Sequence, residues 1–210
     1  MIKAILFDFD GTLADTAPGI ILTMKETFKE MKLPIPDDKA ITQTIGLKLY
    51  DSIKMLGRLS DEKTSEAVEI YRRLFPTCEL THIQMFPGVE EGIRNMVEKG
   101  LRLAICTSRG HDSLKRILSR NGLWECFETI VTASDNIMPK PAPDMVLALL
   151  ERMHLEPDEA VVVGDTTFDI EMGTSAGCST IAVTYGNHPR GQLEAVRPTR
   201  IIDSFGELGF

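Results

Sequence analysis

Two aspartates near the start of the chain have the type and spacing to act together on a phosphate group. Asp8 and Asp10 follow an apolar run, Ile2 to Phe7, which is typical of a strand buried on both faces. Side chains of a strand alternate, so both carboxylates can leave on one side, where they repel each other unless a cation lies between them. Gly11 permits a tight turn with N–H groups free for an anion, and Thr12 adds a hydroxyl. The pattern predicts a metal-assisted phosphate site, although an ordinary strand end with a glycine turn is the alternative.

Three further polar stretches carry candidate site residues. Thr107 and Ser108 end a predicted strand just before a predicted helix, where hydroxyls and N–H groups can hold an anion. Lys140 lies in a proline-stiffened loop, and alone it would be read as solvated. Asp165 ends another apolar run and Asp169 follows one helical turn later, which by itself also fits a helix cap and a first-turn acid.

The elements that must position these residues fall into two regions. Between residues 13 and 82 the sequence predicts no strand, only helices over 18–32, 37–45, 47–56 and 60–75, the first capped by Asp15 or Thr16. From residue 86 onward helices at 89–99, 111–121, 144–153 and 168–176 alternate with strands at 101–106, 128–132, 160–163 and 179–184, and 201–202 adds a short strand. This alternation predicts an α/β fold with a doubly wound parallel sheet, in which ligands bind beyond the carboxyl ends of the strands.

The composition limits the function classes. The chain has 210 residues, 43% of them hydrophobic, and a net charge of −8, which argues against a nucleic-acid surface. The cysteines are scattered without a C-x-x-C pair, so we expect free thiols, those of Cys106 and Cys178 buried, in a reducing, cytoplasmic protein. No signal-peptide pattern and no apolar stretch of membrane-spanning length occurs, so no membrane partner is expected. The histidines at 82, 111, 154 and 188 are far apart and are interpreted as surface or structural residues.

The motifs resemble those of a known family. Asp8-Phe9-Asp10-Gly11-Thr12-Leu13 resembles the first motif of the haloacid dehalogenase-like superfamily of hydrolases, and residues 14–18 resemble its phosphoglycolate phosphatase branch. The other three stretches match the remaining motifs in order, so the resemblance covers about residues 1–15 and 85–190. It implies a Rossmann-like catalytic core, residues 1–15 and 82–210, with an inserted α-helical cap domain at residues 16–81.

The resemblance also implies a role for each core residue. Asp8 would be the nucleophile that forms an aspartyl-phosphate, and Asp10 the acid that protonates the leaving oxygen and then activates water. Asp8, the backbone carbonyl of Asp10, and Asp165 would bind Mg²⁺. Thr107 and Lys140 would bind the transferring phosphoryl group, with Gly11, Thr12 and Ser108 beside it as further substrate contacts. Asp169 would order Lys140 or a metal-bound water.

Two residues depart from the family pattern or lie outside its core. Arg109 stands where relatives often have lysine or asparagine, and it either holds a second anionic group of the substrate or is solvated. Lys48, in the predicted cap, is the candidate for reading the leaving group.

The implied function is a Mg²⁺-dependent phosphatase acting on a small phosphorylated metabolite, with 2-phosphoglycolate as the first candidate. The same core residues would serve a pyrophosphatase, a sugar-phosphate phosphatase or a β-phosphoglucomutase. A phosphoaspartate signalling protein of the receiver type is the alternative from another class. The oligomeric state and the resting position of the cap stay open.

Overall fold

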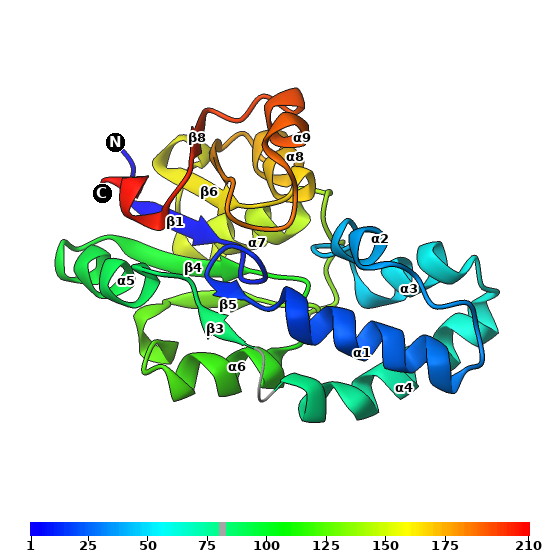
Figure 1. The fold of residues 1–210 in the computed structure, drawn as a ribbon. Helices are drawn as coiled ribbons and strands as arrows, with labels where there is room; N and C mark the ends of the chain where they lie inside the picture. The colour runs from blue at the N-terminus through cyan, green and yellow to red at the C-terminus, as the bar shows by residue number, and fades with distance from the viewer. Residues whose placement is uncertain (80–82) are drawn as a thin grey trace.

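The computed structural model describes residues 1–79 and 83–210 and shows an α/β layer structure with a group of helices at one end (Figure 1). His82 lies outside the described residues. No helix in the described ranges is both long and apolar enough to cross a membrane.

A parallel sheet forms the centre of the larger part. Its strands are β1 (Ala4–Phe7), β4 (Arg102–Cys106), β5 (Thr129–Val131), β6 (Ala160–Gly164), β7 (Ser179–Val183) and β8 (Arg200–Ile202). They lie in the order β5-β4-β1-β6-β7-β8, and every pair is parallel. The first strand therefore lies in the middle, with the chain wound to one side of it and then to the other. In this doubly wound topology the carboxyl ends of β1, β4 and β6 adjoin.

Helices cover both faces of the sheet, as the alternating sequence pattern predicts. Ile5 and Phe7 of β1 face α5 (Val89–Glu98), α6 (His111–Arg120) and the short 3₁₀ helix Phe205–Leu208. Ala4 and Leu6 face the opposite layer, α7 (Asp144–Met153) and α8 (Thr167–Ser175). Because both faces of the sheet are covered, the sequences of these strands are almost continuously apolar. The structure adds α9 (Arg190–Ala195) and 3₁₀ turns at Trp124–Cys126 and Pro157–Glu159, which the sequence did not indicate.

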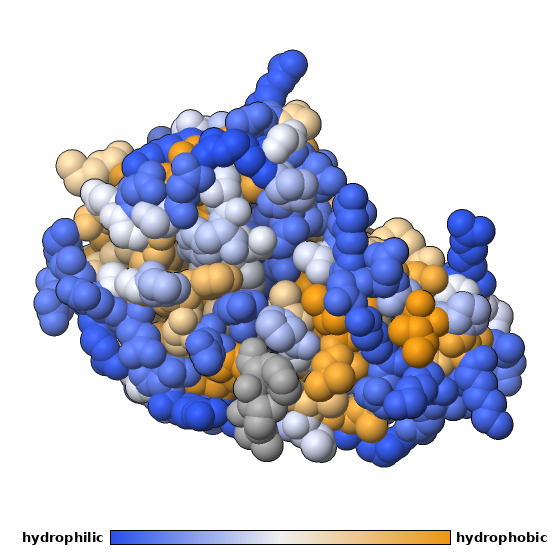
Figure 2. All heavy atoms as spheres, in the orientation of Figure 1, coloured by the Kyte–Doolittle hydropathy of each residue, from blue (hydrophilic) through white to orange (hydrophobic). Residues whose placement is uncertain are grey.

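The second region is a helical insert, defined here as α1 (Ala17–Glu30), α2 (Asp38–Thr42), α3 (Leu49–Gly57) and α4 (Asp61–Glu79). It has its own apolar core, separate from the two layers on the sheet and centred on Met24, Phe28, Ile41, Ile53 and Tyr71. In Figure 1 α1 lies along α4, and in Figure 2 hydrophobic side chains gather over this half of the visible face. The predicted helices are confirmed, but α4 continues through Pro76 rather than ending at residue 75.

Two other predictions about the insert are wrong. Residues 13–82 do contain a strand, β2 (Ala14–Asp15), which pairs antiparallel with β3 (Gln84–Met85). Two residues are too few for an alternating pattern to be recognised, and this strand exists only because its partner, some seventy residues away in sequence, runs beside it. Thr16 occupies the N-cap position of α1, but its hydroxyl makes no capping bond and is buried without a partner among the described residues.

Candidate active site

The ends of three adjacent strands bring the predicted residues together. Asp8 follows β1, Thr107 follows β4 and Asp165 follows β6, and all three are buried. Lys140 reaches the same place from the loop between β5 and α7, and it is only 3% exposed. The reading of Lys140 as a solvated side chain, which its sequence context alone favours, is therefore wrong.

Lys140 joins two of the carboxylates. Its Nζ donates to Oδ1 of Asp8 at 2.5 Å and to Oδ1 of Asp169 at 2.6 Å. Burial disfavours the charged amine, but the carboxylates of Asp169 and Asp8 outweigh burial and raise the pKa of Lys140 above its usual value. The amine thus stays a fixed cation next to Asp8.

Three buried carboxylates, two of them partners of Lys140, lie close together here. Oxygens of Asp8, Asp165 and Asp169 lie within 4.8 Å of one another, and Oδ2 of Asp8 is buried with no hydrogen-bond partner among the described residues. Burial raises the pKa of Asp8 well above its usual range, and the other carboxylates add to this shift while Lys140 opposes it. Burial and the charge of Asp169 likewise raise the pKa of Asp165 to about 7. An excess of oxygen donors and negative charge, with one acceptor unpaired, fits a divalent cation such as Mg²⁺.

Asp165 is held by two neighbours, one of which the sequence interpretation missed. The Thr12 hydroxyl donates to Oδ1 at 2.9 Å, and Asn187 donates its backbone N–H (2.7 Å) and its side-chain amide (2.9 Å) to Oδ2. The same amide donates to the carbonyl of Asp10 at 3.2 Å. The position of Asn187 was a usable signal, because it follows β7 and so belongs to another carboxyl end of the sheet.

Two glycines allow this close approach. A Cβ on Gly11, whose φ is +94°, would lie 2.2 Å from both Asp165 and the Asn187 amide. A Cβ on Gly186 would lie 2.3 Å from the Asp165 side chain. The Asp165 side chain is therefore packed directly against the backbone of both glycines, and this packing fixes its orientation.

Asp169 combines two contacts. Its Oδ2 accepts from the N–H and hydroxyl of Thr166 at 3.0 and 2.6 Å, which completes a capping box at the start of α8, while Oδ1 accepts from Lys140. Thr166, and not Asp165, is thus the N-cap residue of this helix. The helix start fixes the carboxylate that in turn orients Lys140.

The side chain of Asp10 has a different environment. Nε of Arg109 donates to its two oxygens at 3.0 and 3.2 Å, and a terminal nitrogen donates at 2.5 Å. The other terminal nitrogen donates to Ser113 at 2.6 Å, and the guanidinium lies 5.4 and 5.2 Å from the ring centres of Phe9 and Phe75. Arg109 is 6% exposed, so its reading as a solvated side chain is wrong, and its charge is directed at Asp10.

The turn after Asp10 also differs from expectation. The N–H of Gly11 donates to the carbonyl of Ala14, and the N–H of Thr12 to that of Phe9. These two N–H groups are therefore not free for an anion, and Thr12 contributes its hydroxyl to Asp165 instead. The turn therefore helps to position the carboxylate of Asp165 and does not offer these two N–H groups to an anion.

The hydroxyls of Thr107 and Ser108 make different contacts, one within the core and one with the insert. Thr107 accepts the N–H of Arg109 at 3.1 Å, which leaves its hydroxyl hydrogen available for a ligand. Ser108 donates to the carbonyl of Gly46, in the loop between α2 and α3, at 2.6 Å. The insert is thus in contact with the strand ends in this structure.

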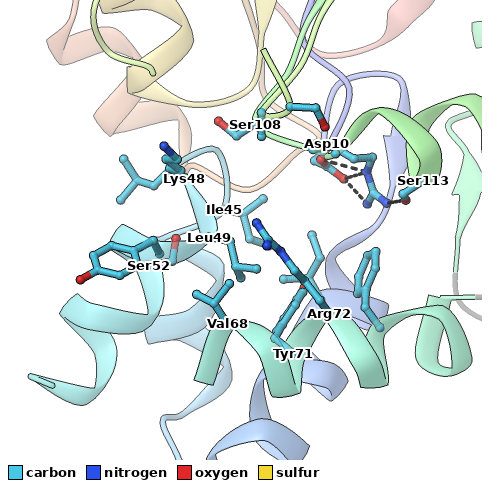
Figure 3. Close-up of a pocket in the computed structure, with 18 of the residues that line it drawn as sticks. Asp10, Ile45, Lys48, Leu49, Ser52, Val68, Tyr71, Arg72, Ser108 and Ser113 are labelled. Atoms are coloured by element: carbon cyan, nitrogen blue, oxygen red, sulfur yellow. Dashed lines mark hydrogen bonds and ion pairs between the residues drawn. The ribbon is translucent and has the colours of Figure 1, made fainter. Parts of the chain in front are cut away.

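A cleft of about 870 Å³ lies between the insert and the core, and Asp10 and Ser108 line its core side. Figure 3 shows its wall of insert side chains below these two residues. Lys48, at the start of α3, is exposed and lines the cleft, whereas Asp8 and Lys140 are buried and are not among its lining residues.

Asp8 follows a central strand of a doubly wound sheet and lies beside the buried Lys140 and two further buried carboxylates. This combination of fold and site indicates the class of protein. The sequence profile described as haloacid dehalogenase-like hydrolase matches residues 5–183, and the chain belongs to this family. It is similar to "Probable phosphatase IndB" of Dickeya dadantii, at 36% identity over 97% of this chain and 90% of the relative. It is also similar to the phosphoglycolate phosphatase of Aquifex aeolicus, at 33% identity over 88% of this chain and 85% of that one.

A solved structure agrees with this assignment. The haloacid dehalogenase-like family hydrolase SP0104 of Streptococcus pneumoniae superposes with a TM-score of 0.88, at 29% identity over 99% of this chain and 96% of that chain. The predicted family and fold class are confirmed.

Proposed function

We propose that this hydrolase is a Mg²⁺-dependent phosphatase that hydrolyses a phosphomonoester through an aspartyl-phosphate. The observation that carries the proposal is the pairing of Asp8 with Lys140 inside a group of buried carboxylates. A carboxylate can attack an anionic phosphate only when the charge is offset, and Lys140 is placed to do this. When bound by Asp8, Asp165 and the carbonyl of Asp10, Mg²⁺ would supply the rest of the charge compensation.

The chain's own residues account for both half-reactions. An oxygen of Asp8 bonds to phosphorus while the bond from phosphorus to the leaving oxygen breaks, and Asp10 gives that oxygen its proton. Asp10 then takes a proton from water, whose oxygen attacks phosphorus, so that inorganic phosphate leaves and Asp8 is regenerated. Thr107 and Lys140 bind the phosphoryl group throughout. For the first step Asp10 must turn away from Arg109, because both of its oxygens accept hydrogen bonds from that guanidinium in this structure.

The helical insert would act as a cap. We divide the chain into a catalytic core, residues 1–15 and 82–210, and a cap, residues 16–81. Water must be excluded while phosphate moves to Asp8 and admitted when it is released, which a hinged cap achieves. The proposed hinges are residues 13–17 and 79–85, and the second includes positions outside the described residues.

The substrate is proposed to be a small phosphorylated metabolite, with no nucleic-acid or membrane partner. 2-Phosphoglycolate, inorganic pyrophosphate and sugar phosphates form the first panel, and transfer of phosphate to a bound sugar would reveal a mutase. The cytoplasmic location remains a prediction, and the four free cysteines fit it; Cys106 and Cys178 are buried as predicted.

The decisive test replaces the nucleophile. Asp8→Asn should abolish Mg²⁺-dependent phosphate release from every substrate that the wild type hydrolyses, because an amide is a poor nucleophile. Asp158→Asn, an exposed aspartate remote from the site, is the control. Mass spectrometry of acid-quenched wild type should find phosphate on the peptide that contains Asp8. Substantial turnover by Asp8→Asn would refute the assignment, and a phosphoaspartate that outlives many turnover times would favour a signalling protein.

A further inference from the structure

The cleft is much larger than the first substrate candidates require. At about 870 Å³ it approaches the upper end of the range for pockets that enclose drug-sized ligands, roughly 300–1,000 Å³. Phosphoglycolate or pyrophosphate would place its phosphoryl group at Asp8 and leave most of this volume to water.

The wall of the cleft on the insert side is largely apolar. It is formed by Ile20, Met24, Ile45, Leu49, Val68 and Phe75, which come from three helices and one loop of the insert. The ring of Phe75 stacks on Tyr71, with the ring centres 5.3 Å apart. Such a wall stabilises a ligand with an apolar body, whereas a short, fully charged acid would gain little from it.

Two cations of the insert, Lys48 and Arg72, line this side of the cleft. Arg72 lies on α4, one helical turn from Val68 and from Phe75, and Figure 3 shows its guanidinium reaching into the cleft below Asp10 and Ser108. Among the described residues it has no hydrogen-bond or ion-pair partner, whereas the next residue, Arg73, pairs with Glu30 of α1.

The other charges around the cleft do not neutralise Arg72. Arg109 is directed at Asp10. Glu69, about one turn before Arg72 on α4, and Asp112 also line the cleft, but among the described residues no ion pair joins either of them to Arg72. In the proposed function the phosphoryl group has its own partners, Lys140 and Thr107. The guanidinium of Arg72 is therefore left for an anionic group elsewhere on the ligand, and its planar fork suits a carboxylate or a second phosphate.

We infer that the substrate of this site is an organic phosphomonoester whose leaving group combines an apolar ring or chain with a second anionic group, bound by Arg72. The inference rests on the proposed phosphatase function and specifies its substrate class. It places 2-phosphoglycolate and pyrophosphate among the poor substrates.

The test compares aryl phosphates that differ by one carboxylate. Wild type should have a higher kcat/KM for 4-carboxyphenyl phosphate than for phenyl phosphate or 2-phosphoglycolate. Arg72→Gln should lower kcat/KM for 4-carboxyphenyl phosphate about tenfold or more, and for phenyl phosphate less than about twofold, because only the first loses a charge-assisted contact. Arg72→Lys, which keeps the charge without the fork, should fall between wild type and Arg72→Gln.

The matched control is Arg73→Gln on the same helix, which should leave both aryl phosphates within about twofold of wild type because its exposed ion pair contributes little. Equal effects of Arg72→Gln on the two aryl phosphates, or no effect on either, would overturn the role of Arg72. A wild type that prefers 2-phosphoglycolate would overturn the substrate class. Each of these outcomes leaves the phosphatase function standing, since that function is tested separately by Asp8→Asn and by the lifetime of the phosphoaspartate.

Discussion

The buried pair of Arg109 and Asp10 makes the clearest prediction about stability. Their side chains are 3% and 11% exposed, and the guanidinium lies 5.4 Å from the ring centre of Phe9 and 5.2 Å from that of Phe75. Arg109→Met keeps an apolar stem of similar length in this layer but leaves the Asp10 carboxylate without its cation. Removing one partner of a buried ion pair costs about 3–5 kcal/mol, since the remaining charge stays desolvated.

The measurement is urea unfolding in metal-free buffer, compared with Arg73→Met. The control breaks a surface pair whose side chains are 58% and 44% exposed, so its loss should stay below about 1 kcal/mol. In the double variant Arg109→Met/Asp10→Asn the stranded charge is gone. Its free energy of unfolding should therefore fall by less than the sum of the two single losses, with a coupling of at least about 1.5 kcal/mol. If Arg109→Met costs no more than the control, or if the two changes are additive, the ion pair does not stabilise the fold as argued.

Three further predictions concern metal, substrate and pH. Calorimetry should show the largest loss of Mg²⁺ affinity in Asp165→Ala and the smallest in Asp10→Asn, which keeps its backbone carbonyl. Asn187→Ala removes a hydrogen-bond partner of Asp165 and should lower the affinity about 10–100-fold. Equal losses in the three variants would contradict the division of roles. Lys48→Ala should lower kcat/KM for 2-phosphoglycolate by about tenfold or more but change p-nitrophenyl phosphate hydrolysis much less, and equal effects would exclude Lys48 from reading the leaving group. Because the pKa of Asp165 is raised from 3.8 to about 7, the folded state binds this proton more tightly than the unfolded state does, and the metal-free protein should lose stability as pH rises from about 4 to about 7. Stabilisation by Mg²⁺ should grow over the same pH range. Urea unfolding at pH 5 and pH 8, with and without Mg²⁺, tests the sign, and a free energy of unfolding that does not change with pH would contradict it.

The sheet and its order of helices could be predicted because each element carries a local signal. An apolar run such as residues 160–163 leads into Gly164 and Asp165, and a parallel sheet then places every such end at one edge. That reasoning brought Asp8, Thr107 and Asp165 together without any structure.

The remaining features depend on contacts between residues far apart in the sequence. Arg109 and Asp10 are 99 positions apart, and no local pattern distinguishes this arginine from a solvated one. Asn187 follows β7, which is a usable signal for its place at the carboxyl ends of the strands, but its contact with Asp165 is not, because asparagine is common in turn-rich stretches for reasons of backbone conformation alone. The strand β2 has no periodicity of its own. Each of these features is determined by a partner rather than by its neighbours in the chain.

The pairing of β2 with β3 has a consequence for how such a chain could be varied. Ala14 lies opposite Met85 and Asp15 opposite Gln84, so the segments that lead into and out of the insert run side by side as a separate two-stranded sheet. The segment between these two strands is joined covalently to the rest of the chain at this one narrow junction, although it also contacts the strand ends through Gly46 and Phe75. Inserts of other lengths and folds could therefore be grafted there without disturbing the order of the sheet, as is usual where chain ends lie side by side. A chimera that keeps residues 1–15 and 84–210 but carries a foreign helical segment should retain the buried carboxylates and change only the compounds admitted to them.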